Sequence, residues 1–175
     1  IRCAGFLVGL AVILGICDFC FAPSGYVRFI LHEVNRKDTQ YDTIILGASH
    51  ARSAINPEYL DEELGTNTLN LAIPGETVKD AYYLLKDACE SNDVKTVIMD
   101  VDYQYWMDEQ PQGYFTEPFI CQNITNLKVK TEYLLDNWDT IDLRNVLVRR
   151  LSWDCTWSSV KQNVSTKMTE AYREY

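Results

Sequence analysis

The sequence predicts an α/β domain with a parallel β-sheet, preceded by an N-terminal transmembrane helix. The sheet is predicted by three short apolar runs, rich in β-branched residues, that alternate with helical segments. This strand–helix–strand–helix–strand order calls for right-handed crossovers and for a parallel sheet covered by helices on both faces. The transmembrane helix is predicted by an apolar run within residues 1–23, which has the length needed to cross a bilayer.

The bounds of these elements follow from turn and capping residues. Asn56 is a good N-cap, Pro57 suits the first position of a helix, and Gly65 suits the helix end. Pro74 and Gly75 likewise end the second apolar run. We therefore expect strands at residues 41–47, 66–72 and 94–101, with helices at 57–63 and 77–89 between them.

The pattern weakens after Asp102. Residues 103–127 are aromatic and polar and contain prolines and a glycine, so we predict a long surface loop there. Helical patterns return at 128–137 and 141–152. The tail at 153–175 is predicted to be helical, although it has no clear apolar face.

Residues 1–23 are predicted to be a transmembrane signal anchor. The apolar run reaches the required length of roughly 20 residues only if Asp18 lies near a membrane interface. No small-x-small cleavage site follows it, which argues against a cleaved signal peptide, and a buried core helix is the other alternative. Basic residues lie on both sides, so the charges give no clear orientation. Residues 24–40 are amphipathic and are predicted to form a stalk leading into the globular domain.

The composition excludes some classes of function. The formal net charge of −9 argues against nucleic-acid binding, because phosphate contacts need clustered Lys and Arg. The apolar fraction of 47% is sufficient for a hydrophobic core. No cofactor is predicted. Asp100 and Asp102 share one face of a strand, but no third ligand accompanies them, so no metal site is predicted either.

The six cysteines are predicted to be free or to serve in packing. Cys17 and Cys20 form a Cys-x-x-Cys pair, but it lies in an apolar helix without a redox-fold pattern. One disulfide among Cys89, Cys121 and Cys155 stays open as an alternative if the domain faces an oxidising compartment.

Ser49 is the first candidate for a functional residue. It follows a predicted buried strand, and ligands of open α/β sheets collect at the carboxyl ends of the strands. Gly75 lies just beyond the second predicted strand, where a glycine permits a positive φ and a close backbone approach. A hydroxyl and an amide at these positions would converge on one crevice, where the amide can stabilise an oxyanion. The alternative is an ordinary turn before each helix.

Four segments of the chain form a set that matches a known family pattern. They are Gly47-Ala48-Ser49-His50, Ile55-Asn56-Pro57, Asn70-Leu71-Ala72-x-x-Gly75-Glu76 and the strand VIMDVDY. Together they resemble the SGNH (GDSL-type) hydrolase superfamily, in particular its membrane-anchored, bacterial cell-envelope members. The resemblance covers about residues 41–105 and implies a three-layer, flavodoxin-like parallel sheet. That sheet is incomplete here, because only three strands are found.

The resemblance also implies roles for individual residues. Ser49 matches the catalytic nucleophile, and its N–H is one donor of the oxyanion hole. Gly75 matches the second donor. The third block of the family reads Gly-x-Asn-Asp, whereas this chain has Asp102-Tyr103-Gln104-Tyr105. The side-chain amide of Gln104 would therefore have to act as the third donor.

The general base of the family comes from an Asp-x-x-His segment that this chain lacks. The two histidines are His32, in the predicted stalk, and His50, whose side chain is expected to diverge from that of Ser49. A serine hydroxyl is a weak nucleophile without a base within about 3 Å. Either the chain is a fragment in which the domain at 41–175 lacks its C-terminal part, or the domain is inactive. We expect a fragment.

By resemblance, the expected function is that of a serine esterase or O-acyltransferase, which acts on acyl esters of cell-envelope glycans through an acyl-serine intermediate. The first alternative is a catalytically inactive envelope module that binds a glycan or a partner protein, and the second is a purely structural, membrane-tethered domain. The domain is expected at the cell membrane, on the extracytoplasmic side. Four loop aromatics either line a carbohydrate crevice or anchor the loop: Tyr103, Tyr105, Trp106 and Tyr114.

Overall fold

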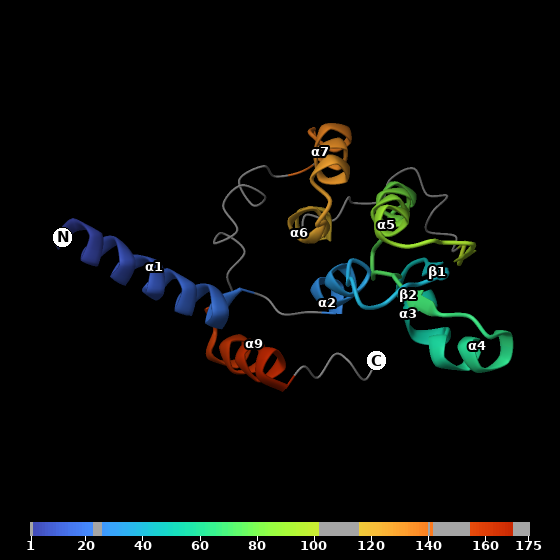
Figure 1. Cartoon of the computed structure of the whole chain (residues 1–175), viewed down its shortest axis with the longest axis horizontal. Helices are drawn as coiled ribbons and strands as arrows, with labels where there is room; N and C mark the ends of the chain where they lie inside the picture. The colour runs from blue at the N-terminus through green and yellow to red at the C-terminus, as the bar shows by residue number, and fades with distance from the viewer. Residues whose placement is uncertain (1, 23–25, 102–115, 140, 142–154, 170–175) are drawn as a thin grey trace. The chain divides into compact units, whose positions relative to one another are not determined.

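The computed structural model describes residues 2–22, 26–101, 116–139, 141 and 155–169 (Figure 1). The chain divides into two compact units. The larger unit, residues 27–143, contains the sheet, and the smaller unit combines residues 1–26 with residues 144–175.

The sheet of the larger unit has three parallel strands in the order β2-β1-β3. They are β1 (Thr43–Leu46), β2 (Thr68–Asn70) and β3 (Thr96–Met99). All four residues of the central strand β1 are buried, as expected of a strand with neighbours on both edges and helices on its faces. The predicted α/β class, parallel sheet and N-terminal apolar helix are confirmed.

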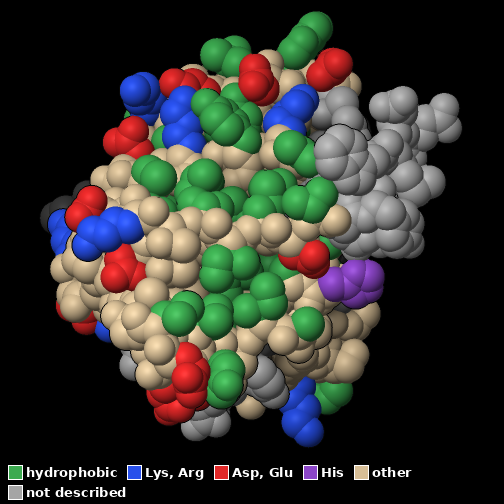
Figure 2. Space-filling model, turned by 90° about the vertical axis from the view of Figure 1, so that its right-hand side faces the viewer, with side chains coloured by type: hydrophobic (Ala, Val, Ile, Leu, Met, Phe, Trp, Pro, Cys, Tyr) green, Lys and Arg blue, Asp and Glu red, His purple; other side chains and the backbone are tan. Residues whose placement is uncertain are grey.

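The strand β3 is much less covered than β1. Its side chains alternate between the two faces of the sheet, and on one face Val97 is 43% and Met99 is 39% exposed. Val101, just beyond the strand, is 56% exposed. Figure 2 looks onto the side of the larger unit where β3 lies in Figure 1, and hydrophobic side chains gather in the middle of this face.

Three helices follow the strands β1 and β2: α3 (Ser49–Ala54), α4 (Pro57–Leu64) and α5 (Val78–Ser91). The predicted caps of α4 are confirmed, because the Asn56 side chain accepts a hydrogen bond from the Glu58 amide and Gly65 takes the left-handed conformation at φ 68°. The helix α5 begins with a capping box between Thr77 and Asp80. The sequence did not predict α3, which is only six residues long.

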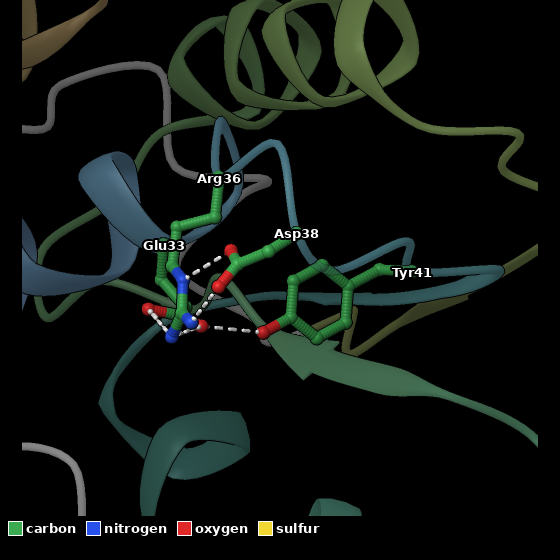
Figure 3. A network of polar contacts seen from close by, with 4 residues as sticks. All are labelled: Glu33, Arg36, Asp38 and Tyr41. Atoms are coloured by element: carbon green, nitrogen blue, oxygen red, sulfur yellow. Dashed lines mark hydrogen bonds and ion pairs between the residues drawn. The ribbon is translucent and has the colours of Figure 1, made fainter.

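The helix α2 (Tyr26–Glu33) lies in the segment that was predicted as a stalk. Ile30, Leu31 and Val34 from this segment are fully buried. After the helix, Arg36 donates hydrogen bonds to Glu33 and Asp38, and the Tyr41 hydroxyl donates to Glu33 across 2.8 Å (Figure 3). Burial raises the pKa of Tyr41, and the hydrogen bond to Glu33 adds to the rise. These contacts join the end of α2 to the start of β1.

The prediction of a loop at residues 103–127 is wrong for residues 116–123, which are helical. Residues 103–115 lie outside the described part of the chain, but Thr116–Asn123 form the helix α6. Pro118 falls in the first turn of α6, where a helix tolerates proline because the amide there has no partner within the helix. Ile120 and Cys121 are fully buried. The helix α7 (Leu127–Asp136) confirms the helix predicted at 128–137.

Polar contacts fix α7 against α5. The Tyr133 hydroxyl donates a hydrogen bond of 2.6 Å to the buried Asp80 carboxylate. Lys86 and Glu132 form a half-buried ion pair between the same two helices. Tyr83 and Tyr133 pack edge to face, with ring centroids 5.2 Å apart. The two helices are therefore joined by hydrogen bonds, charge and aromatic packing together.

The smaller unit contains α1 (Arg2–Phe21) and α9 (Trp157–Thr169). The segment Cys3–Phe21 of α1 is long enough and apolar enough to cross a membrane, with a mean hydropathy of 2.3. The helix α9 packs on the end of α1: Lys167 donates hydrogen bonds to the Phe19 and Ala22 carbonyls, and Asn163 donates to the Cys20 carbonyl. The predicted helical tail is confirmed over Trp157–Thr169, and most of the helix predicted at 141–152 lies outside the described residues.

Candidate functional site at the strand ends

Ser49 is the first residue of α3 and lies just beyond the carboxyl end of β1. Its side chain is exposed, whereas β1 and Ala48 before it are buried. The N-cap residue Ala48 has no side-chain group that could accept a hydrogen bond from the first amides of α3. The exposed Ser49 hydroxyl therefore lies next to the first backbone amides of α3, which donate to no capping side chain. This is the edge of the sheet at which α/β folds bind their ligands.

Gly47 makes the sharp turn from β1 into α3. Its φ is +148°, and a Cβ at this position would lie 2.7 Å from the Ala51 Cβ and 2.9 Å from the Asp100 Cβ. Side chains do not tolerate such distances, so only glycine allows α3 to start this close to the end of β3. The turn that presents Ser49 is therefore built on a residue without a side chain.

The ends of β1 and β2 stay paired beyond the strands themselves. The Leu71 amide donates to the Ile45 carbonyl at 2.8 Å, and the Ile73 amide donates to the Gly47 carbonyl at 3.0 Å. Pro74 and Gly75 then form a turn in which Gly75 is exposed and has a φ of 78°. Ser49 and Gly75 thus leave adjoining strand ends, each two residues after this last shared hydrogen bond.

Asn70 at the end of β2 holds α3 in place. Its side-chain amide donates hydrogen bonds of 3.2 Å to the carbonyls of Ala51 and Ile55. Its side-chain oxygen accepts a hydrogen bond of 3.0 Å from the Ala72 amide. One buried carboxamide therefore links the second strand to both the middle and the end of the helix that begins at Ser49.

Glu76 is the residue at this site that the sequence reasoning missed. It follows the exposed Gly75, yet its side chain is only 1% exposed. Its Oε2 accepts a hydrogen bond of 2.9 Å from the Ile73 amide, whereas Oε1 is buried without a hydrogen-bond partner. Burial raises the pKa of Glu76 well above its ordinary value. An acidic residue in a Pro-Gly turn has the sequence pattern of a surface residue, so no local pattern indicates this burial.

The remaining candidate residues are not all brought to the site. Gln104, the proposed third donor, lies outside the described residues, as do Asp102 and the loop aromatics Tyr103, Tyr105, Trp106 and Tyr114. Asp100 is described and half-buried beside the Gly47 turn. The roles predicted for Ser49 and Gly75 stay predictions.

The two histidines are not placed alike. His50 is exposed on α3 directly after Ser49, and consecutive side chains of a helix do not face each other. His32 is exposed on α2, before the N-terminal end of β1, whereas Ser49 follows its other end. His50 is therefore not positioned as a general base for Ser49.

Metal and thiol chemistry find little support in the described part of the chain. Within it, no three His, Cys, Asp or Glu side chains are grouped so that they could hold a metal ion. All six cysteines are described and free. Cys121 is fully buried, and burial raises the pKa of its thiol to about 11. A thiol with a raised pKa is a poor nucleophile at neutral pH.

Comparison of the chain with models of protein families, with curated proteins and with solved structures finds no match.

Proposed function

We propose that the larger unit is an SGNH-type serine esterase or O-acyltransferase domain in which Ser49 is the nucleophile. The observation that carries this proposal is the pairing of two strand ends, one bearing an exposed serine and the other an exposed glycine with positive φ. The Ser49 hydroxyl would attack an ester carbonyl and form an acyl-serine, and the leaving alcohol would take up the hydroxyl proton. The Ser49 and Gly75 amides would stabilise the oxyanion.

The proposed acceptors are water or a sugar hydroxyl, and the proposed substrates are acyl esters of cell-envelope glycans. The helix α1 supports a membrane location, because its exposed side chains are apolar over a length that spans a bilayer. We propose that α1 anchors the protein in the cell membrane with the larger unit on the extracytoplasmic side.

The alternative is a non-catalytic envelope module that binds a glycan or a partner protein in the same crevice. One observation favours it: residues 1–175 contain no Asp-x-x-His segment, and His50 does not face Ser49 on α3. Without a base, the hydroxyl stays protonated and reacts slowly with an ester.

Labelling of the full-length protein with a fluorophosphonate probe in detergent tests the proposal. We expect covalent labelling of the full-length protein that is lost in Ser49→Ala. Ser53→Ala is the matched control, because Ser53 is also exposed on α3, one turn later. Labelling should persist in this control.

The absence of labelling in the wild-type full-length protein, or equal labelling of both variants, would reject the enzymatic proposal. An unlabelled chain that binds acylated glycan in a Ser49-independent manner would instead support the non-catalytic module. If the circular dichroism spectrum of Ser49→Ala matches that of the wild type, the loss of labelling in this variant is not caused by unfolding.

A further inference from the structure

We propose that Glu76 is the positioning residue of this site, which holds the Gly75 turn against the Gly47 turn and thereby sets the Gly75 amide beside Ser49. This inference rests on the proposed function. It adds a residue that does not touch the substrate but fixes the geometry of a group that does.

Glu76 closes the Gly75 turn with two hydrogen bonds to Ile73. The Glu76 amide donates to the Ile73 carbonyl at 2.9 Å, and the Glu76 carboxyl accepts from the Ile73 amide at 2.9 Å. Main chain and side chain of one residue thus hold both polar groups of Ile73. Gly75 lies inside the turn that these two bonds close, so the direction of its amide depends on them.

The Ile73 amide also joins the Gly75 turn to the Gly47 turn. The Ile73 amide is shared between the Glu76 carboxyl and the Gly47 carbonyl, at 2.9 and 3.0 Å. Gly47 belongs to the turn that presents Ser49. Loss of the Glu76 side chain would leave the Ile73 amide to the Gly47 carbonyl alone, and would thus remove the link between this shared donor and the Gly75 turn.

The Glu76 side chain is a buried carboxyl among described neighbours that include no cation. A buried polar group with an unmatched oxygen is unfavourable, so an apolar residue would serve better if the position only needed filling. Three elements face the carboxyl: Ile73 at the end of β2 and Gly47 in the turn after β1 contribute amides, and α5 contributes Asp80. The charged group acting on Glu76 is thus an acid, and none of these described neighbours is a cation.

This environment makes the Gly75 turn, which Glu76 holds, sensitive to pH. Burial raises the pKa of Glu76 well above its ordinary value, the Ile73 and Gly47 amides oppose the rise, and the charge of Asp80 adds to it. In its neutral form the carboxyl can remain buried. Ionisation would leave a charge inside the unit with one oxygen unpaired, so the turn should open as the pH rises through the raised pKa.

The test uses the full-length protein in detergent, with the variants Glu76→Ala and Glu76→Gln. Asp87→Asn is the matched control, because Asp87 is a fully buried carboxyl on α5 that contacts Asn35 and Asn126 and not the turns. Two quantities are measured from about pH 5 to about pH 9. One is the rate of fluorophosphonate labelling, and the other is hydrogen exchange of the peptide that contains residues 73–76.

We expect Glu76→Ala to slow labelling by about tenfold or more, because a misplaced donor weakens oxyanion stabilisation. Exchange in residues 73–76 should become faster. Glu76→Gln keeps an acceptor for Ile73 and cannot ionise, so its rate should remain within about threefold of wild type near neutral pH. As the pH rises, the labelling rate of the wild type should fall relative to that of Glu76→Gln. The protection of residues 73–76 from hydrogen exchange should fall in the same way. Asp87→Asn should change neither the rate of labelling nor the hydrogen exchange of residues 73–76.

Three results would overturn the inference: wild-type labelling and exchange in Glu76→Ala, an identical pH profile in Glu76→Gln and wild type, or an equal effect of Asp87→Asn. The comparison of the pH profiles of Glu76→Gln and the wild type tests the inference even if Glu76→Ala does not fold. If the wild type is not labelled at all, the proposed function fails on its own. The exchange measurement then still decides whether Glu76 holds the turn.

Discussion

Gly47 lies so close to Asp100 that a Cβ at position 47 would be 2.9 Å from the Asp100 Cβ. The contact brings the end of β3 against the turn between β1 and α3. A side chain at position 47 would therefore collide with the end of β3.

Gly47→Ala should destabilise the larger unit by about 2–4 kcal/mol, from backbone strain at positive φ and from overpacking. Urea unfolding followed by circular dichroism measures the change in the free energy of unfolding. Gly65→Ala is the control. Gly65 also has a positive φ, of +68°, but nothing lies within 4 Å of a Cβ there, so this variant should lose only about 1 kcal/mol. Equal losses in both variants would contradict the close approach.

The hydrogen bond between Tyr133 and Asp80 should contribute measurably to stability. Tyr133→Phe removes a donor from a buried carboxylate, which typically costs about 1–3 kcal/mol. Thermal or urea unfolding measures the loss. Tyr59→Phe removes a hydroxyl from a side chain that is 62% exposed and should leave the stability unchanged. A Tyr133→Phe variant as stable as Tyr59→Phe would contradict the packing of α7 on α5.

The cysteines should differ in their reactivity towards N-ethylmaleimide. Cys121 is fully buried and its thiol pKa is raised to about 11, so it should react far more slowly than the exposed Cys89 and Cys155. Mass spectrometry of peptides from the briefly labelled native protein gives the relative rates. In urea the three rates should become similar. Fast labelling of Cys121 in the native protein would show that α6 is not packed as described.

Asp87 should make the stability depend on pH. Its pKa is raised by burial, against the hydrogen bonds from Asn35 and the Asn126 amide, so near and above the ordinary value of 3.8 the native state binds more protons than the unfolded state. The free energy of unfolding should therefore fall as the pH rises from that value through the raised pKa. Asp87→Asn should flatten this decline, whereas Glu63→Gln, at an exposed position, should keep it. Urea unfolding at a series of pH values measures the slope, and an unchanged slope in Asp87→Asn would contradict the burial.

Residues 20 and 163 should be close in the smaller unit, because the Asn163 side chain donates to the Cys20 carbonyl at 3.4 Å. With Cys20 as the only other cysteine, Asn163→Cys should be joined to it by a short bifunctional maleimide. Gln162→Cys, on an exposed position of α9, should not. The intramolecular link is detected by mass spectrometry after proteolysis. Efficient linking of the control, or none in Asn163→Cys, would argue against the packing of α9 on α1.

Much of the fold could be predicted because the responsible residues act locally. Asn56, Pro57 and Gly65 determine the ends of α4 through their own backbone preferences and short-range hydrogen bonds. The strands were recognised from their apolar, β-branched runs. Their bounds were predicted too wide, because hydrophobic pattern does not show where ladder pairing stops.

The missed features depend on contacts between distant segments. The helix α3 is too short for a periodic pattern and is held by Asn70 from the neighbouring strand. The helix α6 contains a proline that resembles a loop signal. The buried Glu76 carboxyl lies beside the turn at Gly47, which is far from it in the sequence. Ser49 and Gly75 could be selected from sequence, whereas the carboxyl between their turns could not.

The uncovered side of β3 has a consequence for the larger unit when it is handled in water. Within the described sheet, β3 pairs with β1 alone, and Val97, Met99 and Val101 expose apolar surface along it. A strand with free main-chain groups and apolar side chains is a template onto which another extended segment can add. At high concentration, soluble preparations of this unit should therefore self-associate through β3, and a lysine at position 97 or 99 should keep them dispersed.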